Sequence, residues 1–212
     1  MICKDFQCVY VHIPKVAGQS IERFFYSVLG VNREALLLGH NEDPKLGPEE
    51  LSHLRAEEYI SFGYMTSEQF NSYYKFSFVR NPWTRLVSEY IFNGYISKFE
   101  FKDFVFNNFP EIDNHDDAYR HILPQYEFLY DSGENLLVDF VGKFENLQAD
   151  FNIVCQKLGI ENTKLPHLNS SKKNKALKEY KPYWEYYDDE TKEFVAKFYQ
   201  KDIETFAYTF GE

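Results

Sequence analysis

An apolar run leads directly into a short turn that contains a lysine, a glycine and a serine. Residues 9–20 read Val-Tyr-Val-His-Ile-Pro-Lys-Val-Ala-Gly-Gln-Ser, and apolar residues then recur at helical spacing at Ile21, Phe24, Phe25, Val28 and Leu29. This pattern predicts a strand over 8–13 and a helix over 20–29. The start of such a helix offers unpaired N–H groups and the positive end of its dipole, while Gly18 allows close backbone approach and Lys15 adds a charge. The turn is therefore predicted to bind a phosphate.

This loop differs from the nucleoside-triphosphate loop Gly-x-x-x-x-Gly-Lys-Ser/Thr. Lys15 precedes Gly18, and no Gly-Lys-Ser follows. Strand–turn–helix units with an incidental lysine and glycine also occur in many α/β domains. The first unit alone leaves both interpretations open.

A second strand–turn–helix unit follows at residues 75–90, Lys-Phe-Ser-Phe-Val-Arg-Asn-Pro-Trp-Thr-Arg-Leu-Val-Ser-Glu-Tyr. We expect a strand over 75–80 and a helix over 82–93, because Pro82 suits a first helical position and apolar residues repeat at helical spacing after it. Arg80 then lies at the carboxyl end of a strand, where parallel sheets bind ligands and a guanidinium can pair with phosphate. Arg85 is expected to point away from the apolar face, as a solvated or ion-paired arginine or as a ligand contact.

Together, the two units resemble the PAPS-dependent sulfotransferases, where PAPS is 3′-phosphoadenosine 5′-phosphosulfate. The chain is most similar to the carbohydrate branch, which includes the heparan sulfate 2-O-sulfotransferase type and short bacterial relatives. Residues 137–147 and 165–169 are similar to stretches that these relatives carry in the same order. The resemblance implies an α/β fold of the P-loop-NTPase-like sulfotransferase type, with a central parallel sheet flanked by helices. We expect a single domain over residues 1–212.

The resemblance also implies roles for individual residues. Arg80 and Ser88 would hold the 3′-phosphate, and the 5′-phosphosulfate would be held by the loop of Lys15, Val16, Ala17, Gly18, Gln19 and Ser20. Two separate phosphate sites on one sheet edge suit a nucleotide phosphorylated at both positions, whereas ATP would need one. Lys15 would also stabilise the charge that develops on the oxygen bridging sulfur and phosphorus, and this scheme requires no metal. The product would be 3′,5′-adenosine bisphosphate.

The acceptor hydroxyl needs a base, and the chain has six histidines. His53 is the preferred candidate, because residues 51–58 resemble the His-x-x-Ala-x-Glu segment that supplies an acceptor-side histidine in the family. An ordinary surface histidine is the alternative reading, with His40 as the second choice of base. His12 is expected to be a packed, hydrogen-bonded strand residue.

The segment 113–125 offers weaker candidates. His115 stands among Asp113, Asp116 and Asp117 without a second ligand pair at a recognised spacing, so we interpret this stretch as a solvated acidic loop rather than a metal site. His121 and Gln125 fall where relatives carry a Pro-Gln pair and are candidates for acceptor contacts.

Further periodic segments complete the expected order of elements. A polar insert is expected to extend to about residue 72, followed later by a strand over 136–141. A helix should then end before Gly159, and another is expected near 189–205. The length of 212 residues suffices for one sizeable core.

Charge and composition limit the partners. The formal net charge of −10 disfavours nucleic-acid binding and docking along a heavily sulfated polymer, so the acceptor is expected to be a neutral or weakly acidic carbohydrate or glycan. No apolar run of about 20 residues and no leader are present, which favours a cytoplasmic protein without membrane insertion. The three cysteines lack metal-ligand spacing and are expected to be reduced. The sequence does not indicate the oligomeric state.

One basic stretch stands apart from this acidic composition, with Lys172, Lys173, Lys175, Lys178 and Lys181 close together. It is either a solvated loop or a flap over the nucleotide, as in related enzymes. Two other function classes stay open. A nucleotide or small-molecule kinase would use the same architecture, but its Gly-Lys-Ser/Thr signature and magnesium carboxylate are missing. A non-catalytic nucleotide-binding module would keep nucleotide affinity without transfer.

Overall fold

The computed structural model describes residues 1–166 and 181–211, and a four-stranded sheet lies at its centre. The strands are adjacent in chain order: β1 (Ile2–Cys3), β2 (Cys8–Val11), β3 (Tyr74–Val79) and β4 (Phe140–Lys143). β2, β3 and β4 run parallel, whereas β1 pairs antiparallel to β2. The expected all-parallel sheet is therefore mixed at one edge, because a tight turn over residues 4–7 brings the chain back as β2 beside β1.

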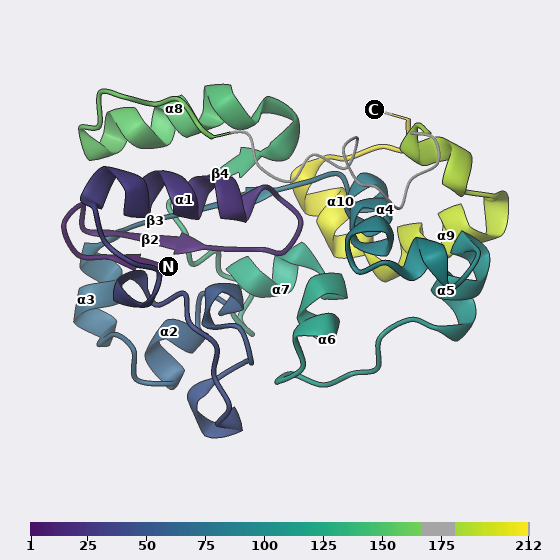
Figure 1. Cartoon of the computed structure of the whole chain (residues 1–212), viewed down its shortest axis with the longest axis horizontal. Helices are drawn as coiled ribbons and strands as arrows, with labels where there is room; N and C mark the ends of the chain where they lie inside the picture. Colours follow the sequence, from purple (N-terminus) through teal and green to yellow (C-terminus); the bar gives the residue numbers. More distant parts are fainter. Residues whose placement is uncertain (167–180, 212) are drawn as a thin grey trace.

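Helices cover both faces of this sheet, which makes the molecule an α/β fold. α1 (Gly18–Leu29) and α8 (Leu147–Leu158) lie on one side, and α2 (Glu58–Ser61) and α7 (Gln125–Leu129) lie on the other (Figure 1). α1 and α8 pack against each other through an edge-to-face contact between Phe24 and Phe151, with ring centroids 4.9 Å apart. Every residue of β2 is buried, as expected for a strand covered on both faces.

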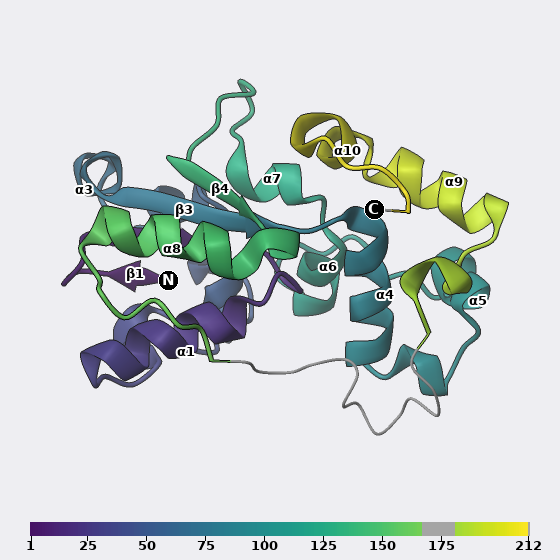
Figure 2. The same ribbon diagram turned by 90° about the horizontal axis from the view of Figure 1, so that it is seen from above.

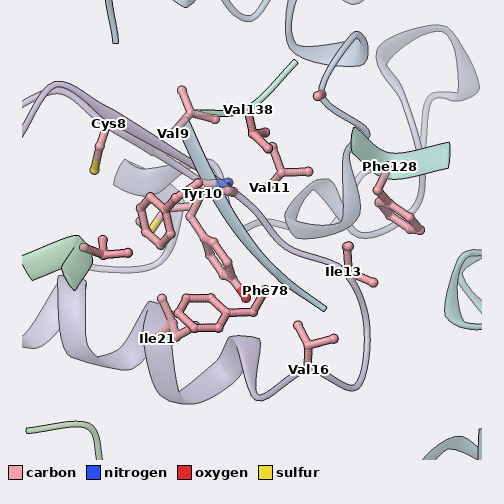
Figure 3. Packing of buried hydrophobic residues seen from close by; sticks show 14 of the residues in the cluster. Cys8, Val9, Tyr10, Val11, Ile13, Val16, Ile21, Phe78, Phe128 and Val138 are labelled. Carbon is pink, nitrogen blue, oxygen red and sulfur yellow. Dashed lines mark hydrogen bonds between the residues drawn. The ribbon is translucent and has the colours of Figure 1, made fainter. Parts of the chain in front are cut away.

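The apolar residues behind the predicted loop belong to this core. Val16 and Ile21 belong to the same buried cluster as Tyr10 and Phe78 (Figure 3), and none of the four side chains is exposed. Val16 thus fixes the loop to the sheet. All three cysteines are free and buried.

The remaining helices form a second group beside the sheet (Figure 2). They include α4 (Pro82–Phe92), α5 (Phe101–Asn107), α6 (Asp117–Ile122), α9 (Asp189–Phe198) and α10 (Gln200–Phe206), while the short α3 (Ser67–Ser72) precedes β3. Most of their buried apolar residues, among them Trp83, Tyr90 and Phe104, make a hydrophobic cluster separate from the one around the sheet. The described residues therefore bury two hydrophobic clusters, and Tyr119 packs against both of them.

Two predicted elements differ from the structure. The strand expected over 136–141 begins at Phe140, because Leu136 forms a bridge with Tyr130 and the ladder to β3 starts where Phe140 faces Phe76. The helix expected near 189–205 is two helices that break at Tyr199, whose hydroxyl donates to the Ile122 carbonyl at 2.6 Å. Among the described residues, no helix has the length and apolar character needed to cross a membrane.

Candidate functional site

The loop between β2 and α1 has a strained backbone. Lys15 and Ala17 adopt positive φ angles of 71° and 70° although neither is glycine. A side chain in this left-handed region costs about 1–2 kcal/mol, and such strain persists where the surroundings impose it, often at functional sites. Ala17 precedes the first turn of α1 without a side-chain cap, so the helix begins with its N–H groups turned to the loop.

The ring of His12 leaves no room for a side chain at Gly18. A Cβ atom at Gly18 would lie 1.8 Å from Nε2 of His12. His12 cannot easily move away, because its Nδ1 lies 2.6 Å from Oε1 of Glu22 and both side chains are buried. The prediction that His12 is a packed, hydrogen-bonded strand residue is confirmed. The sequence predicted that Gly18 allows a ligand to approach the backbone closely. In the structure, the absence of a side chain at Gly18 leaves room for the His12 ring.

The Lys15 ammonium packs on an aromatic ring. Its Nζ lies 3.3 Å from the centroid of Phe92, at the carboxyl end of α4. Burial lowers the pKa of Lys15 to about 8; Glu89 acts in the opposite direction, and Arg80 and Arg85 reinforce the decrease. Lys15 is thus a partly desolvated cation, which interacts strongly with an anion placed beside it.

Arg80 connects the two sequence motifs. Its Nη1 donates to the Lys15 carbonyl at 3.1 Å, and its Nε donates to the Thr84 hydroxyl at 3.0 Å. The amide of Gln125 bonds both the N–H and the carbonyl of Arg80, at 2.8 Å each. Gln125 is fully buried and also contacts Asp202, so the prediction that it touches an acceptor is wrong. Its amide fixes the end of β3 instead.

Arg80 and Ser88 line one pocket of about 220 Å³. Thr84, Lys181 and Tyr183 line it too, which adds an ammonium group and further hydroxyls to the guanidinium. This combination suits a phosphate. Of the predicted basic flap, Lys181 reaches the pocket, whereas Lys172, Lys173, Lys175 and Lys178 lie outside the described residues. A larger cavity of about 570 Å³ lies between α1 and residues 162–166, but none of the predicted site residues lines it.

Arg85 is not solvated, and it pairs with no carboxylate in the part of the chain that the structure describes. It is 2% exposed, and its guanidinium donates to the backbone carbonyls of Pro14, Leu123 and His121 at 2.9–3.0 Å. The expectation of a solvated or ion-paired arginine is therefore wrong. The side chain joins the start of the loop to the end of α6.

His53 belongs to a buried chain of imidazoles and carboxylates. Its Nδ1 lies 2.5 Å from Oδ1 of Asp117, and the other oxygen of Asp117 lies 3.2 Å from Nε2 of His121. Nδ1 of His121 in turn lies 2.6 Å from Glu89. The ring of His53 also meets that of His12 edge to face, with centroids 4.8 Å apart. The reading of His53 as an ordinary surface histidine is wrong.

The pKa values of His53 and His121 are shifted in opposite directions. Burial lowers the pKa of His53 to about 4, although Asp117 acts in the opposite direction. Burial also disfavours protonation of His121, but Glu89 and Asp117 outweigh it and raise its pKa to about 9. Burial of Asp117 is likewise outweighed by hydrogen bonds from His121 and His53, which hold its pKa well below the usual range. At neutral pH, His121 is charged and His53 is neutral.

The remaining candidates of this kind differ in burial and in their partners. His40 is exposed, and its Nδ1 lies 3.5 Å from Glu50. His115 contacts the Gly47 carbonyl at 2.8 Å. Asp117 is not part of a solvated acidic loop, as the sequence suggested, but begins α6 between two histidines. His121 is buried against Glu89 and Asp117, so its ring nitrogens face carboxylates rather than an acceptor.

His53, Asp117 and His121 also form a group whose potential ligand atoms lie within 4.8 Å of one another. Two ligands of one tetrahedral zinc ion are about 3.3 Å apart, given bonds of about 2.0–2.1 Å. Nδ1 of His53 and Oδ1 of Asp117 are 2.5 Å apart, which is shorter than the distance between two zinc ligands and is typical of a hydrogen bond. The group is built as a hydrogen-bonded chain.

The histidine chain and the loop contact each other at two points. His12 packs on Gly18 and also touches His53. At the other end, Phe92 lies under Lys15 and stacks on His121, with ring centroids 6.1 Å apart. The predicted nucleotide loop and the predicted base are therefore parts of one site.

Sequence reasoning missed several residues of this site: Glu22, Glu89, Phe92 and Asp117. A signal for two of them was present in α4, where Arg85, Ser88, Glu89 and Phe92 recur at intervals of three and four residues. They form a second helical face beside the apolar one. Asp117 has no such signal, because its partner His53 is 64 residues away in the chain.

Comparison with known proteins identifies the family of the chain. The family model described as the sulfotransferase family matches residues 1–209. A protein of uncharacterised function from Archaeoglobus fulgidus is 32% identical over 94 residues, which cover 43% of this chain and 72% of that protein. No solved structure matches. The family match covers nearly the whole chain, so the chain belongs to the sulfotransferase family and is a transferase of sulfuryl groups.

Proposed function

We propose that the protein transfers the sulfuryl group of PAPS to a hydroxyl of a carbohydrate or glycan-like acceptor and releases 3′,5′-adenosine bisphosphate. One observation supports the donor above all others. The Arg80 guanidinium contacts the Lys15 carbonyl at 3.1 Å while it lines the pocket that also contains Ser88. A cationic loop at a helix start and a second basic pocket are thus adjacent, as a nucleotide with 5′ and 3′ phosphates requires.

In this proposal the loop residues 15–20 hold the 5′-phosphosulfate, and Arg80 and Ser88 hold the 3′-phosphate. A new bond forms between the acceptor oxygen and sulfur, and the bond between sulfur and the bridging 5′-phosphate oxygen breaks. Negative charge develops on that bridging oxygen, and the Lys15 ammonium stabilises it electrostatically. His53 accepts the proton of the acceptor hydroxyl, because it is neutral at neutral pH and its side chain keeps a tenth of its surface exposed. No step requires a metal ion.

The class of acceptor is proposed from the net charge of the protein. With a net charge of −10, the protein repels polyanions at long range, which favours a neutral or weakly acidic sugar over nucleic acid or a heavily sulfated polymer. The high proportion of aromatic residues offers surfaces for sugar rings.

Calorimetric titration with 3′,5′-adenosine bisphosphate tests the donor without knowledge of the acceptor. We expect clear preference for the bisphosphate over adenosine 5′-monophosphate and over ATP with magnesium. Arg80→Ala should abolish the preference, and Arg33→Ala, at an exposed arginine, should keep it. Preference for ATP with magnesium would instead favour a kinase and refute the proposal.

A panel of sugars with labelled PAPS then tests transfer. Lys15→Ala should lower the transfer rate severely while the fold is retained, because the side chain packs at the site rather than in the core. Bisphosphate binding without transfer to any hydroxyl would favour a non-catalytic nucleotide-binding module. Wild-type turnover by Lys15→Ala would refute the role given to Lys15.

A further inference from the structure

A neutral histidine can act as a base only through the nitrogen that carries no proton, so the tautomer of His53 decides its use. Nδ1 of His53 lies 2.5 Å from a carboxylate oxygen of Asp117, whose pKa is held well below the usual range. A carboxylate can only accept at that distance, so Nδ1 must carry the proton. Nε2 is then the free acceptor, and among the described residues it has no hydrogen-bond partner.

Asp117 is itself held in place from its other side. Its second oxygen lies 3.2 Å from Nε2 of His121, and Nδ1 of His121 lies 2.6 Å from Glu89, which is fully buried on α4. Both ring nitrogens of His121 face carboxylates, so both act as donors and the ring is an imidazolium. Glu89 thus holds His121, and His121 in turn holds the Asp117 carboxylate in its orientation toward His53.

The other groups around His53 complete the arrangement. His12 meets its ring edge to face from β2's end and is itself fixed to Glu22 at 2.6 Å. Two imidazoles, His12 and His121, thus flank His53, and Asp117 is the carboxylate that contacts it directly. A proton taken up by Nε2 would be stabilised by Asp117 and opposed by the charge on His121.

We infer that Asp117 is the positioning residue of His53: it fixes the imidazole with its proton on Nδ1 and leaves Nε2 to take the acceptor's hydroxyl proton, while His121 and Glu89 hold Asp117. This inference rests on the proposed function for the role of His53 as base. The tautomer and its cause stand on the contacts alone. Asp117 and His53 then have the roles found where a carboxylate orients a histidine base without itself becoming protonated.

Nitrogen NMR on protein labelled at histidine tests the tautomer directly. At pH 7 we expect His53 to be protonated on Nδ1 alone and His121 to be protonated on both nitrogens. Asp117→Asn should remove this preference, and Asp116→Asn is the matched control. Asp116 is the adjacent residue, and its side chain caps α6 by accepting from the Ala118 N–H at 2.8 Å. A proton on Nε2 of His53 in the wild-type protein would overturn the inference, even where Asp117→Asn fails to fold.

Transfer from labelled PAPS to an acceptor found in the sugar panel tests the consequence. Asp117→Asn should lower kcat by about 10²-fold, the scale of general-base catalysis, and leave the KM for PAPS unchanged. In a His53→Gln background the same change should have no further effect, because residues that act as a unit are not additive. Wild-type kcat in Asp117→Asn would overturn the inference. Failure of the wild-type protein to bind the bisphosphate would refute the proposed function and leave the tautomer result standing.

Discussion

Gly18→Ala should damage the protein through His12 rather than through the nucleotide. The added Cβ would lie 1.8 Å from Nε2 of the ring, so the ring must retreat by about 1.6 Å to restore an ordinary contact of 3.4 Å. Such a shift breaks the buried hydrogen bond to Glu22, which has a length of 2.6 Å. Loss of a hydrogen bond to a charged group costs about 1.5–3 kcal/mol, and overpacking costs about 1–3 kcal/mol.

We therefore expect the free energy of unfolding of Gly18→Ala to fall by about 3–5 kcal/mol, a large part of the 5–15 kcal/mol typical of a domain. Urea denaturation followed by fluorescence measures this change. Gly39→Ala is the matched control, because nothing lies within 4 Å of a Cβ atom there, and it should be nearly neutral.

A double-mutant cycle identifies the cause. In a His12→Ala background the ring is absent, so Gly18→Ala should cost little or become slightly stabilising, since alanine favours helix over glycine. An equal cost of Gly18→Ala with and without the His12 ring would refute this explanation. It would point instead to an intrinsic requirement of the loop backbone.

Three further predictions concern charge and backbone strain. The affinity for 3′,5′-adenosine bisphosphate should decrease as pH rises above about 8, where Lys15 loses its proton, and Lys15→Arg should remove this dependence in calorimetry. The pKa of His121 is raised to about 9, so its stabilising effect is complete below about pH 6.5 and disappears as pH rises through 9; wild-type protein should lose about 2–3 kcal/mol more than His121→Gln across that window. Ala17→Gly should raise the free energy of unfolding by about 0.5–1 kcal/mol, because glycine relieves the φ of 70°. A loss of stability in Ala17→Gly would show that the loop is not strained.

Much of the fold follows from local pattern. The bounds of β3 and α4 agree with the predicted ones to within one residue, because an alternating apolar strand and a proline-initiated helix are both specified by neighbouring residues. The error at β4 has a different origin. Leu136, Leu137 and Val138 look like strand residues, but their pairing is decided by where Tyr130 and Phe76 lie, which local sequence does not state. The antiparallel β1 was missed because it is two residues long.

The candidate site likewise contains residues that local sequence identifies and residues whose roles depend on packing. Lys15, Gly18 and Arg80 could be selected from sequence because each stands at a fixed offset from a strand end, where helix dipoles and sheet edges place ligands. Arg85 and Gln125 were also noticed, but their roles were wrong. Their partners are the backbone carbonyls of Pro14 and His121 for Arg85 and the backbone of Arg80 for Gln125. A contact to the backbone of a distant segment depends on packing, and no residue type marks it.

The histidine chain shows why such contacts matter for chemistry. His53 belongs to a network whose members come from several segments: His12 beside β2, Glu89 in α4, and Asp117 and His121 in α6. Each of these residues taken alone has an ordinary interpretation in the sequence, and one of them, His12, was correctly predicted to be structural. The same ring nevertheless fixes Gly18 in the loop and packs on His53. A residue can thus be structural in its contacts and still link the nucleotide loop to the base, and that connection is a property of the fold rather than of any motif.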